Sequence, residues 1–300
     1  MNIMDLFNAL PGAVAQGLIW GIMGIGVFLT YKVLDIADLT VDGSITTGGA
    51  TCIMLMVAGC PAMLGALVAG LLAGLITGVL HTFMGIPALL AGILTQLSLY
   101  SINLAILGHR SNQPISVDKY DLLISSRYIL KALPVVAVLV VVIIAALYWF
   151  FGTALGCSIR STGANPNMSR AQGININFTK IFGLMLSNGI VALSGALLSQ
   201  YNGFADVKMG IGSIIIGLAA VIIGDVIFSR IFHNFALRLL SVVFGAIIYY
   251  IVITFVLQLG LNADYLKLLS AVVVALFLAI PYWKGKYFGK KANKGDKTNA

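Results

Sequence analysis

The chain has 300 residues, of which 60% are hydrophobic and 9% are charged, with a formal net charge of +8. Soluble globular chains carry about 25% charged residues, so this composition excludes a soluble protein. The mean hydropathy of +1.02 reflects apolar residues along the whole chain, whereas a secretory signal would be one apolar stretch before a polar mature protein. The sequence therefore predicts an all-α, polytopic membrane protein.

Apolar runs near the length that crosses a bilayer, about 20 residues, predict about nine transmembrane helices, within a range of eight to ten. The runs cover residues 11–31, 43–59, 61–81, 88–108, 132–151, 178–200, 211–228, 236–258 and 262–281. The second run is the least regular, because Asp42, Gly43 and Ser44 stand at its start. Such a polar, glycine-rich start fits a broken helix that lines a cavity as well as a full span.

A transmembrane domain over residues 1–283 is followed by a basic tail, 284–300, which holds six Lys and one Asp. Lys clusters beside a membrane mark its cytoplasmic side and touch anionic lipid, and we prefer this interpretation to nucleic-acid binding. The loop 152–180 holds three basic residues and no acid, and four spans separate it from the tail. Both segments are therefore expected in the cytoplasm, with the 109–131 loop outside. The N-terminus is external with nine spans and internal with eight.

Small residues recur every four positions along the third span, at Ala62, Ala66, Gly70, Gly74 and Gly78. This spacing makes a smooth stripe on one helix face, where a second helix can approach closely. We therefore expect Gly70, Gly74 and Gly78 to form a helix–helix contact.

Polar residues at membrane depth need a partner or water. Gln96, Tyr100 and Asn103 lie on one face of the fourth span, and Asn188 lies within the sixth. These residues are candidates for the wall of a translocation pathway. An interhelical hydrogen-bond seam explains Gln96, Tyr100 and Asn103 equally well.

Signals for catalysis, metals or nucleotides are weak. Cys52, Cys60 and Cys157 form no CxxC pair, and the three His residues have no second His or Cys at ligand spacing,. The chain also lacks a Walker A sequence, a GxGxxG motif and a nucleophile elbow,. We therefore expect no enzyme, catalytic residue, metal or cofactor in this chain, and its energy must come from a gradient or from another subunit.

A long polar stretch between the fifth and sixth spans, about residues 156–180, reads GCSIRSTGANPNMSRAQGININFTK. Gly163 and Pro166 are expected to interrupt the chain. Residues 167–172 can form a helix of about two turns that Gly173 ends, and either Asn165 or Asn167 can cap its start. A short helix parallel to the membrane could serve as a rigid lever for a motor subunit. An ordinary connecting loop is the simpler alternative.

The residues of this stretch resemble the cytoplasmic motif of bacterial ABC-importer permeases, in the family that includes the branched-chain amino-acid and ribose permeases. The matching positions are Arg160, Gly163, Asn165, Pro166, Arg170, Gly173 and Ile174. Residues 34–50 and 194–225 resemble two further stretches of the family, so the resemblance covers about residues 10–282.

Three positions depart from the family pattern. Met168 and Ser169 stand where members usually have two Ala, and Asn167 stands where sugar permeases often have an acid. Residues 34–50 are most similar to a branch whose binding-protein partners resemble those for aromatic amino acids. The resemblance therefore implies an amino acid as the solute, with an aromatic one favoured by this branch.

The resemblance further implies a multi-pass permease subunit in a bacterial inner membrane, paired with a second copy as a homodimer or with a similar chain as a heterodimer. Two ATP-binding subunits, which hold ATP and Mg, would dock on residues 160–174. An extracellular solute-binding lipoprotein would deliver the solute.

Competing functions remain open from the sequence. An importer of the same class could carry sugars or nucleosides. A gradient-driven secondary transporter would commonly show internal repeats and intramembrane charges, and neither is evident here. A membrane-embedded enzyme would need paired acids or His clusters within its spans.

Overall fold

The computed structural model describes residues 3–116, 119–120, 122–228, 231–232, 234–258 and 266–283. The predicted basic tail, 284–300, lies outside these residues. The elements are α1 (Ile3–Phe28), η1 (Leu29–Val33), α2 (Thr40–Val57), α3 (Ala62–Thr82), α4 (Ala88–Ile106), β1 (Asn112–Pro114), η2 (Ser126–Tyr128), α5 (Ile129–Phe151), α6 (Ala154–Ala164), α7 (Pro166–Ala171), α8 (Ile176–Asn202), β2 (Phe204–Asp206), α9 (Ser213–Phe228), α10 (Phe235–Gln258) and α11 (Leu266–Trp283).

Each predicted span coincides with one helix, but the number of membrane crossings is confirmed only in part. Six helical stretches within the described ranges are long and apolar enough to cross a membrane: α1 with η1, α3, α4, η2 with α5, α8 and α10. The helices on the second, seventh and ninth predicted spans are shorter, with 18 residues in α2, 16 in α9 and 18 in α11. The fold is a helical bundle, and a count of nine spans is not established.

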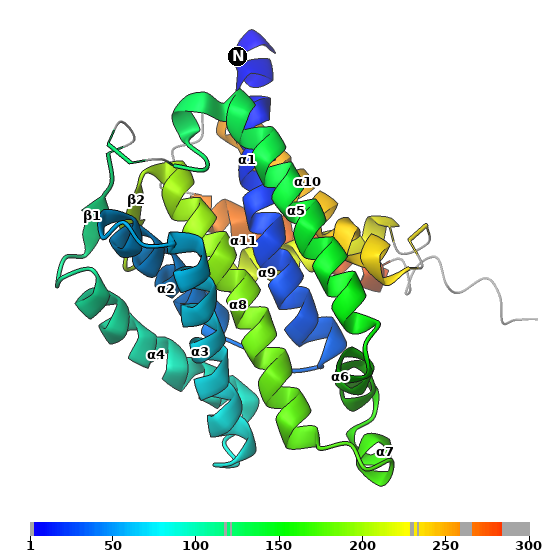
Figure 1. Ribbon diagram of the computed structural model, residues 1–300. Helices are drawn as coiled ribbons and strands as arrows, with labels where there is room; N and C mark the ends of the chain where they lie inside the picture. The colour runs from blue at the N-terminus through cyan, green and yellow to red at the C-terminus, as the bar shows by residue number, and fades with distance from the viewer. Residues whose placement is uncertain are drawn as a thin grey trace, which may run out of the picture.

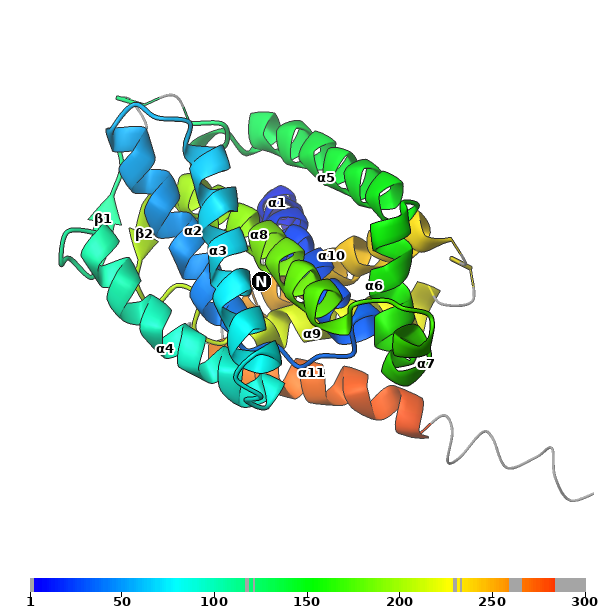
Figure 2. The same ribbon diagram turned by 60° about the horizontal axis from the view of Figure 1, so that its bottom comes forward.

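Helices α1 and α8 lie at the centre of the bundle, with α5 along one flank and α4 along another (Figure 2). The N-terminal end of α1 lies at the opposite end of the molecule from α6 and α7 (Figure 1). The start of α1 and the α6–α7 segment therefore lie at opposite ends of the long helices (Figure 1).

The small-residue stripe of α3 faces α8. A methyl group added at Gly70 or Gly74 would meet the α8 backbone at Asn188 or Leu184, and Gly78 lies against the same helix. The two backbones approach so closely because these positions carry no side chain. The central helix α8 is held in the same way elsewhere, since small residues of α2 also pack on it.

The chain is not helical just before the polar start of the second span. The π-helix η1 ends at Val33, residues 34–39 are not helical, and α2 then begins at Thr40. Gly43 and Gly48 lie against Leu99 of α4 and Ala192 of α8, so these glycines permit close packing. The polar start of the second span, with Asp42, Gly43 and Ser44, is therefore part of one continuous helix, and the break lies before it, at residues 34–39.

Asp42, in the first turn of α2, caps the start of another helix. Its Oδ2 accepts a hydrogen bond from the backbone N–H of Gly212 at 2.8 Å. Its Oδ1 accepts bonds from the Ser213 hydroxyl and the Ile214 backbone N–H, each at 2.8 Å. The carboxylate satisfies donors that the first turn of α9 leaves unpaired, which fixes α9 against α2.

A two-stranded antiparallel sheet was not predicted. It pairs Asn112 with Asp206, Gln113 with Ala205 and Pro114 with Phe204. The sheet joins the α4–α5 connection to the α8–α9 connection. Strands of three residues are too short for an alternating pattern to reveal them in the sequence.

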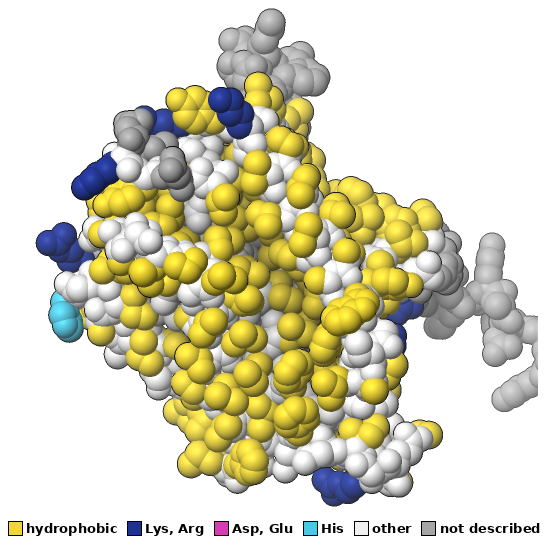
Figure 3. Space-filling model, in the orientation of Figure 1, with side chains coloured by type: hydrophobic (Ala, Val, Ile, Leu, Met, Phe, Trp, Pro, Cys, Tyr) yellow, Lys and Arg dark blue, Asp and Glu magenta, His cyan; other side chains and the backbone are white. Residues whose placement is uncertain are grey.

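Hydrophobic side chains cover a broad part of the face shown in Figure 3, and Lys and Arg side chains lie at its margins. Exposed apolar residues lie on several outer helices, including Val68 and Leu72 of α3 and Val138 and Val141 of α5. Such an extensive apolar exterior suits contact with lipid rather than water.

Candidate functional site

The α6–α7 segment is built from two capped helices. The Thr153 hydroxyl accepts a hydrogen bond from the Gly156 N–H at the start of α6. The Asn165 Oδ1 accepts one from the Met168 N–H at 3.1 Å, and Pro166 occupies the first turn of α7. Gly173 follows α7 with a φ of +80°, a left-handed conformation that glycine adopts readily. Both ends of α7 are therefore sharply defined.

The prediction that Gly163 interrupts the chain is wrong, because this residue lies inside α6. A methyl group at Gly163 would meet the backbone carbonyl of Val33. Glycine is needed there for close packing of α6 on η1. The sequence also predicted one short helix in this stretch, whereas the structure has two.

Side chains tie α6 to the bundle. One Arg160 guanidinium nitrogen, Nη2, donates to the Phe151 carbonyl at 2.9 Å, and the guanidinium carbon lies 5.7 Å from the centre of the Phe235 ring. The Thr162 hydroxyl lies 3.2 Å from the Thr179 hydroxyl of α8. Movement of α6 would therefore be transmitted to α8 and to the end of α5.

The outer side of α7 is open to other molecules. Asn167, Met168 and Arg170 are exposed, whereas Ser169 is buried. Within the described residues, the Arg170 guanidinium has no hydrogen-bond or ion-pair partner. A guanidinium in this position can bind a carboxylate of a partner protein through two parallel hydrogen bonds.

A buried polar network lies near the centre of the bundle, where the residues before α2 and its first turns meet α8. The Asn188 amide nitrogen donates to the Asp38 Oδ2 at 2.7 Å and to the Leu184 carbonyl at 3.0 Å. The Asn188 amide oxygen accepts from the Ser44 hydroxyl at 2.6 Å. The Asp38 Oδ1 accepts the Thr40 N–H at 2.9 Å. These bonds hold the non-helical residues 34–39 against α8.

Hydroxyl groups extend this network toward α4. The Thr40 and Thr77 hydroxyls lie 2.7 Å apart, and Thr77 donates to the Thr95 hydroxyl at 2.9 Å. The chain of contacts joins α2, α3 and α4, and all three Thr side chains are buried. This polar seam holds the helices around the break in register.

The three candidate pathway residues of α4 lie in different surroundings. Tyr100 is 45% exposed, Gln96 is half-buried, and Asn103 is buried with 1% exposure. Neither side-chain polar atom of Asn103 has a hydrogen-bond partner among the described residues. Asn188, by contrast, uses both ends of its amide in the network. The structure does not bring Asn188 and the α4 residues into one hydrogen-bonded group.

Sequence reasoning missed the roles of Asp38, Asp42 and Ser44. Their signal was the pair of carboxylates four residues apart in a chain whose apolar runs otherwise hold almost no acid. Buried charges of this kind need several hydrogen-bond donors. Within the described ranges, no group of three His, Cys, Asp or Glu side chains could hold a metal ion.

The family model for the permease component of branched-chain amino acid transport systems matches residues 10–280. The tyrosine transport system permease protein of Clostridioides difficile (strain R20291) is 40% identical over 277 residues, which cover 91% of each chain. The D-allose transport system permease protein AlsC of Escherichia coli (strain K12) is 27% identical over 82% of this chain and 73% of its own length.

A solved structure supports the fold independently. The chain is similar to a chain of PsaBC from Streptococcus pneumoniae in complex with Fab, with a TM-score of 0.52 and 16% identity. The similarity covers 94% of this chain and 93% of that one. The helical architecture, the family match along nearly the whole chain and the 40% identical relative agree, and this chain belongs to the family of permease components of branched-chain amino acid transport systems.

Proposed function

We propose that this chain is the membrane subunit of an ATP-driven importer that carries an amino acid, with an aromatic amino acid as the preferred solute. The observation that supports this most directly is the 40% identity, over 91% of each chain, with a permease named for tyrosine transport. The relative named for D-allose transport is only 27% identical, and sugar import is therefore the second candidate.

In this proposal ATP hydrolysis takes place on partner subunits that dock on residues 160–174. Exposed Arg170 would bind a partner carboxylate, and the capped α7 would move as a rigid body. Arg160 and Gly163 join this movement to the bundle through their contacts with Phe151 and Val33. Helix α7 stays short because its start is fixed by Asn165 and Pro166 and its end by Gly173. These residues have a coupling role and no catalytic one.

The topology belongs to the same proposal. The α6–α7 end and the C-terminal tail face the cytoplasm, the N-terminal end faces outside, and a second copy completes the pathway. Replacing exposed Asn167 by Cys, after Cys60 and Cys157 are changed to Ser, places one label at this end. An impermeant maleimide should not label it on intact cells and should label it after permeabilisation. Labelling of intact cells would reverse the orientation.

Among the candidate pathway residues, Asn103 is the strongest, because it is buried and its amide has no partner among the described residues. Asn103→Leu should leave the thermal stability unchanged or slightly higher while altering transport or solute preference. Loss of stability with normal transport per folded molecule would favour the hydrogen-bond seam instead. Gln96→Leu, at the half-buried position two turns earlier, provides the companion variant.

The decisive test is uptake into proteoliposomes that contain the chain, a candidate ATP-binding subunit and a candidate solute-binding protein. Labelled tyrosine should accumulate when ATP is enclosed and not when a proton gradient replaces ATP. Excess phenylalanine should compete, whereas allose should not. Accumulation driven by the gradient alone would identify a secondary transporter, and competition by allose alone would identify a sugar importer.

A further inference from the structure

An open cavity of about 910 Å³ lies at the α6 end of the molecule, between η1, α6, α9 and α10. Its lining combines three cationic, two anionic and three aromatic side chains. These are Lys32, Arg160, Arg238, Asp35, Asp225, Phe28, Tyr31 and Phe235. The cavity is separate from the exposed side of α7 and from the buried Asp38 network. The coupling role proposed for Arg160 does not account for Lys32, Arg238 and Asp225.

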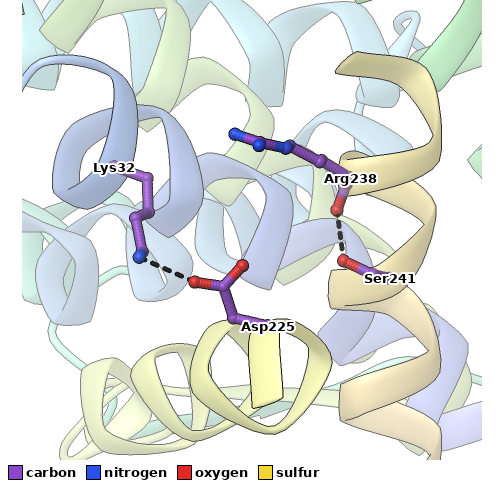
Figure 4. A network of polar contacts seen from close by, with 4 residues as sticks. All are labelled: Lys32, Asp225, Arg238 and Ser241. Atoms are coloured by element: carbon purple, nitrogen blue, oxygen red, sulfur yellow. Dashed lines mark hydrogen bonds and ion pairs between the residues drawn. The ribbon is translucent and has the colours of Figure 1, made fainter. Parts of the chain in front are cut away.

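Two cations of this cavity, Arg160 and Arg238, have no ion-pair partner among the residues that the structure describes. Lys32 pairs with Asp225 at 2.7 Å, and Arg238 extends from α10 above this pair (Figure 4). No described residue forms a hydrogen bond or an ion pair with the Arg238 guanidinium. Arg160 uses one terminal nitrogen for the Phe151 carbonyl and Cys157 sulfur, and the structure gives no acid as its partner. The cavity therefore presents two guanidinium groups to an anion, and guanidinium geometry matches phosphate oxygens.

A second cavity of about 610 Å³ shares Arg160 and Phe235 with the first and is lined by Tyr148 and Trp149 near the end of α5. Trp149 is 75% exposed and Tyr148 57%. Exposed Trp and Tyr at a helix end are typical of the level of lipid headgroups. The exposed side chains of the turns that immediately precede them in α5 are apolar. The second cavity therefore lies between a lipid-facing helix surface and Arg160.

We propose that these neighbouring cavities bind an anionic phospholipid, with its phosphate between Arg238 and Arg160 and its acyl chains along the exposed face of α5. Basic pockets between helices at the cytoplasmic membrane surface bind anionic headgroups. A bound lipid would bridge α6 and α10, and so would set how firmly α6 rests on the bundle. This inference rests on the proposed orientation, with α6 at the cytoplasmic surface, and does not depend on which solute the chain carries.

The test is native mass spectrometry of the full chain, purified in detergent with equal amounts of phosphatidylglycerol and phosphatidylcholine of matched acyl chains. The wild type should retain phosphatidylglycerol preferentially. Arg238→Gln should weaken that retention about fivefold, the factor expected from one lost Arg at a lipid surface. Lys208→Gln, which removes an exposed cation beside β2, is the matched control and should leave retention unchanged. Equal retention of the two lipids, or an equal loss in both variants, would overturn the proposal.

Two further measurements show whether the ligand is a lipid or a soluble anion, and whether a variant has lost binding or has failed to fold. Excess inorganic phosphate should not displace the lipid, and displacement would assign the cavity to a soluble anion instead. Arg238→Lys keeps the positive charge but lacks the planar guanidinium with its parallel N–H donors. Its retention of phosphatidylglycerol should therefore fall between those of the wild type and Arg238→Gln. All variants should elute from size exclusion as the wild type does, because Arg238 is exposed. Retention by Arg238→Gln equal to that of the wild type would remove Arg238 from the site.

Discussion

Helices α5 and α8 are both long enough to cross a membrane, but they occupy opposite environments. In the apolar stretch of α5, 22% of residues are buried, against 72% in α8. Helix α5 is nevertheless the more apolar of the two. Helix α8 carries Ser187, Asn188 and Ser194, which are all buried, and the more polar helix is therefore the inner one.

This inversion follows from the solvent. Lipid is as apolar as a Leu side chain, so burying apolar surface between helices gains little, and close backbone contact and interhelical hydrogen bonds must hold the bundle. Small and polar residues therefore mark the centre, and Val and Leu mark the periphery. The comparison predicts that α8 contacts are sensitive to added volume or lost hydrogen bonds, and that outward positions are tolerant.

The largest effect should come from Gly74→Leu in α3. A side chain at this position would meet the α8 backbone at Leu184, and overpacking alone costs about 1–3 kcal/mol where side chains can move. Because a backbone cannot move aside easily, we expect almost no folded protein in fluorescence-detected size exclusion. Ser98→Leu on the exposed side of α4 is the matched control and should fold normally. Normal folding of Gly74→Leu would place the stripe against lipid.

The next effect should come from Asp42→Ala, which removes the acceptors of three donors at the start of α9. Loss of a helix cap costs about 0.5–2 kcal/mol, and the midpoint of thermal unfolding in detergent should fall accordingly. In the control, Asp206→Ala, the lost carboxylate accepts one hydrogen bond, from the Lys208 N–H. Equal midpoints for the two variants would show that the cap contributes little to stability.

A smaller effect is expected for Ser44→Ala, which leaves the Asn188 amide oxygen without its donor. Interhelical hydrogen bonds in membranes contribute about 0.6 kcal/mol on average, so the unfolding midpoint should fall slightly. Ser98→Ala removes a hydroxyl that bonds only the Leu94 carbonyl of its own helix, and the midpoint should stay unchanged. A larger loss in Ser98→Ala would contradict the importance given to the buried network.

The sequence predicted those features that follow from a repeated spacing or a strong local signal. Apolar runs located the long helices. Gly173, with Asn165 or Asn167 as the candidate cap, located α7 to within one residue, because caps and terminators act over short distances. The four-residue spacing from Ala62 to Gly78 identified the packing face of α3 but not the helix that it meets.

Features that depend on distant parts of the chain could not be predicted in this way. The role of Gly163 depends on the approach of η1, which is more than 100 residues away in sequence. The roles of Asp38 and Asp42 depend on Asn188 of α8 and on the start of α9. A single sequence shows that such carboxylates need donors, but not where the donors come from.

The central claim, that residues 160–174 couple ATP hydrolysis to transport, is tested most directly by measuring complex recovery, ATP hydrolysis and uptake together in proteoliposomes. Arg170→Glu should lower recovery of the ATP-binding subunit, because it replaces an unpaired cation by a charge that repels carboxylates. Gly173→Pro should allow assembly and hydrolysis but reduce uptake per ATP, because proline cannot adopt the φ of +80° found there,. Lys208→Gln, at the opposite end, should behave as the wild type. Wild-type recovery and coupled uptake in both variants would contradict the account and reduce the α6–α7 segment to a passive connection.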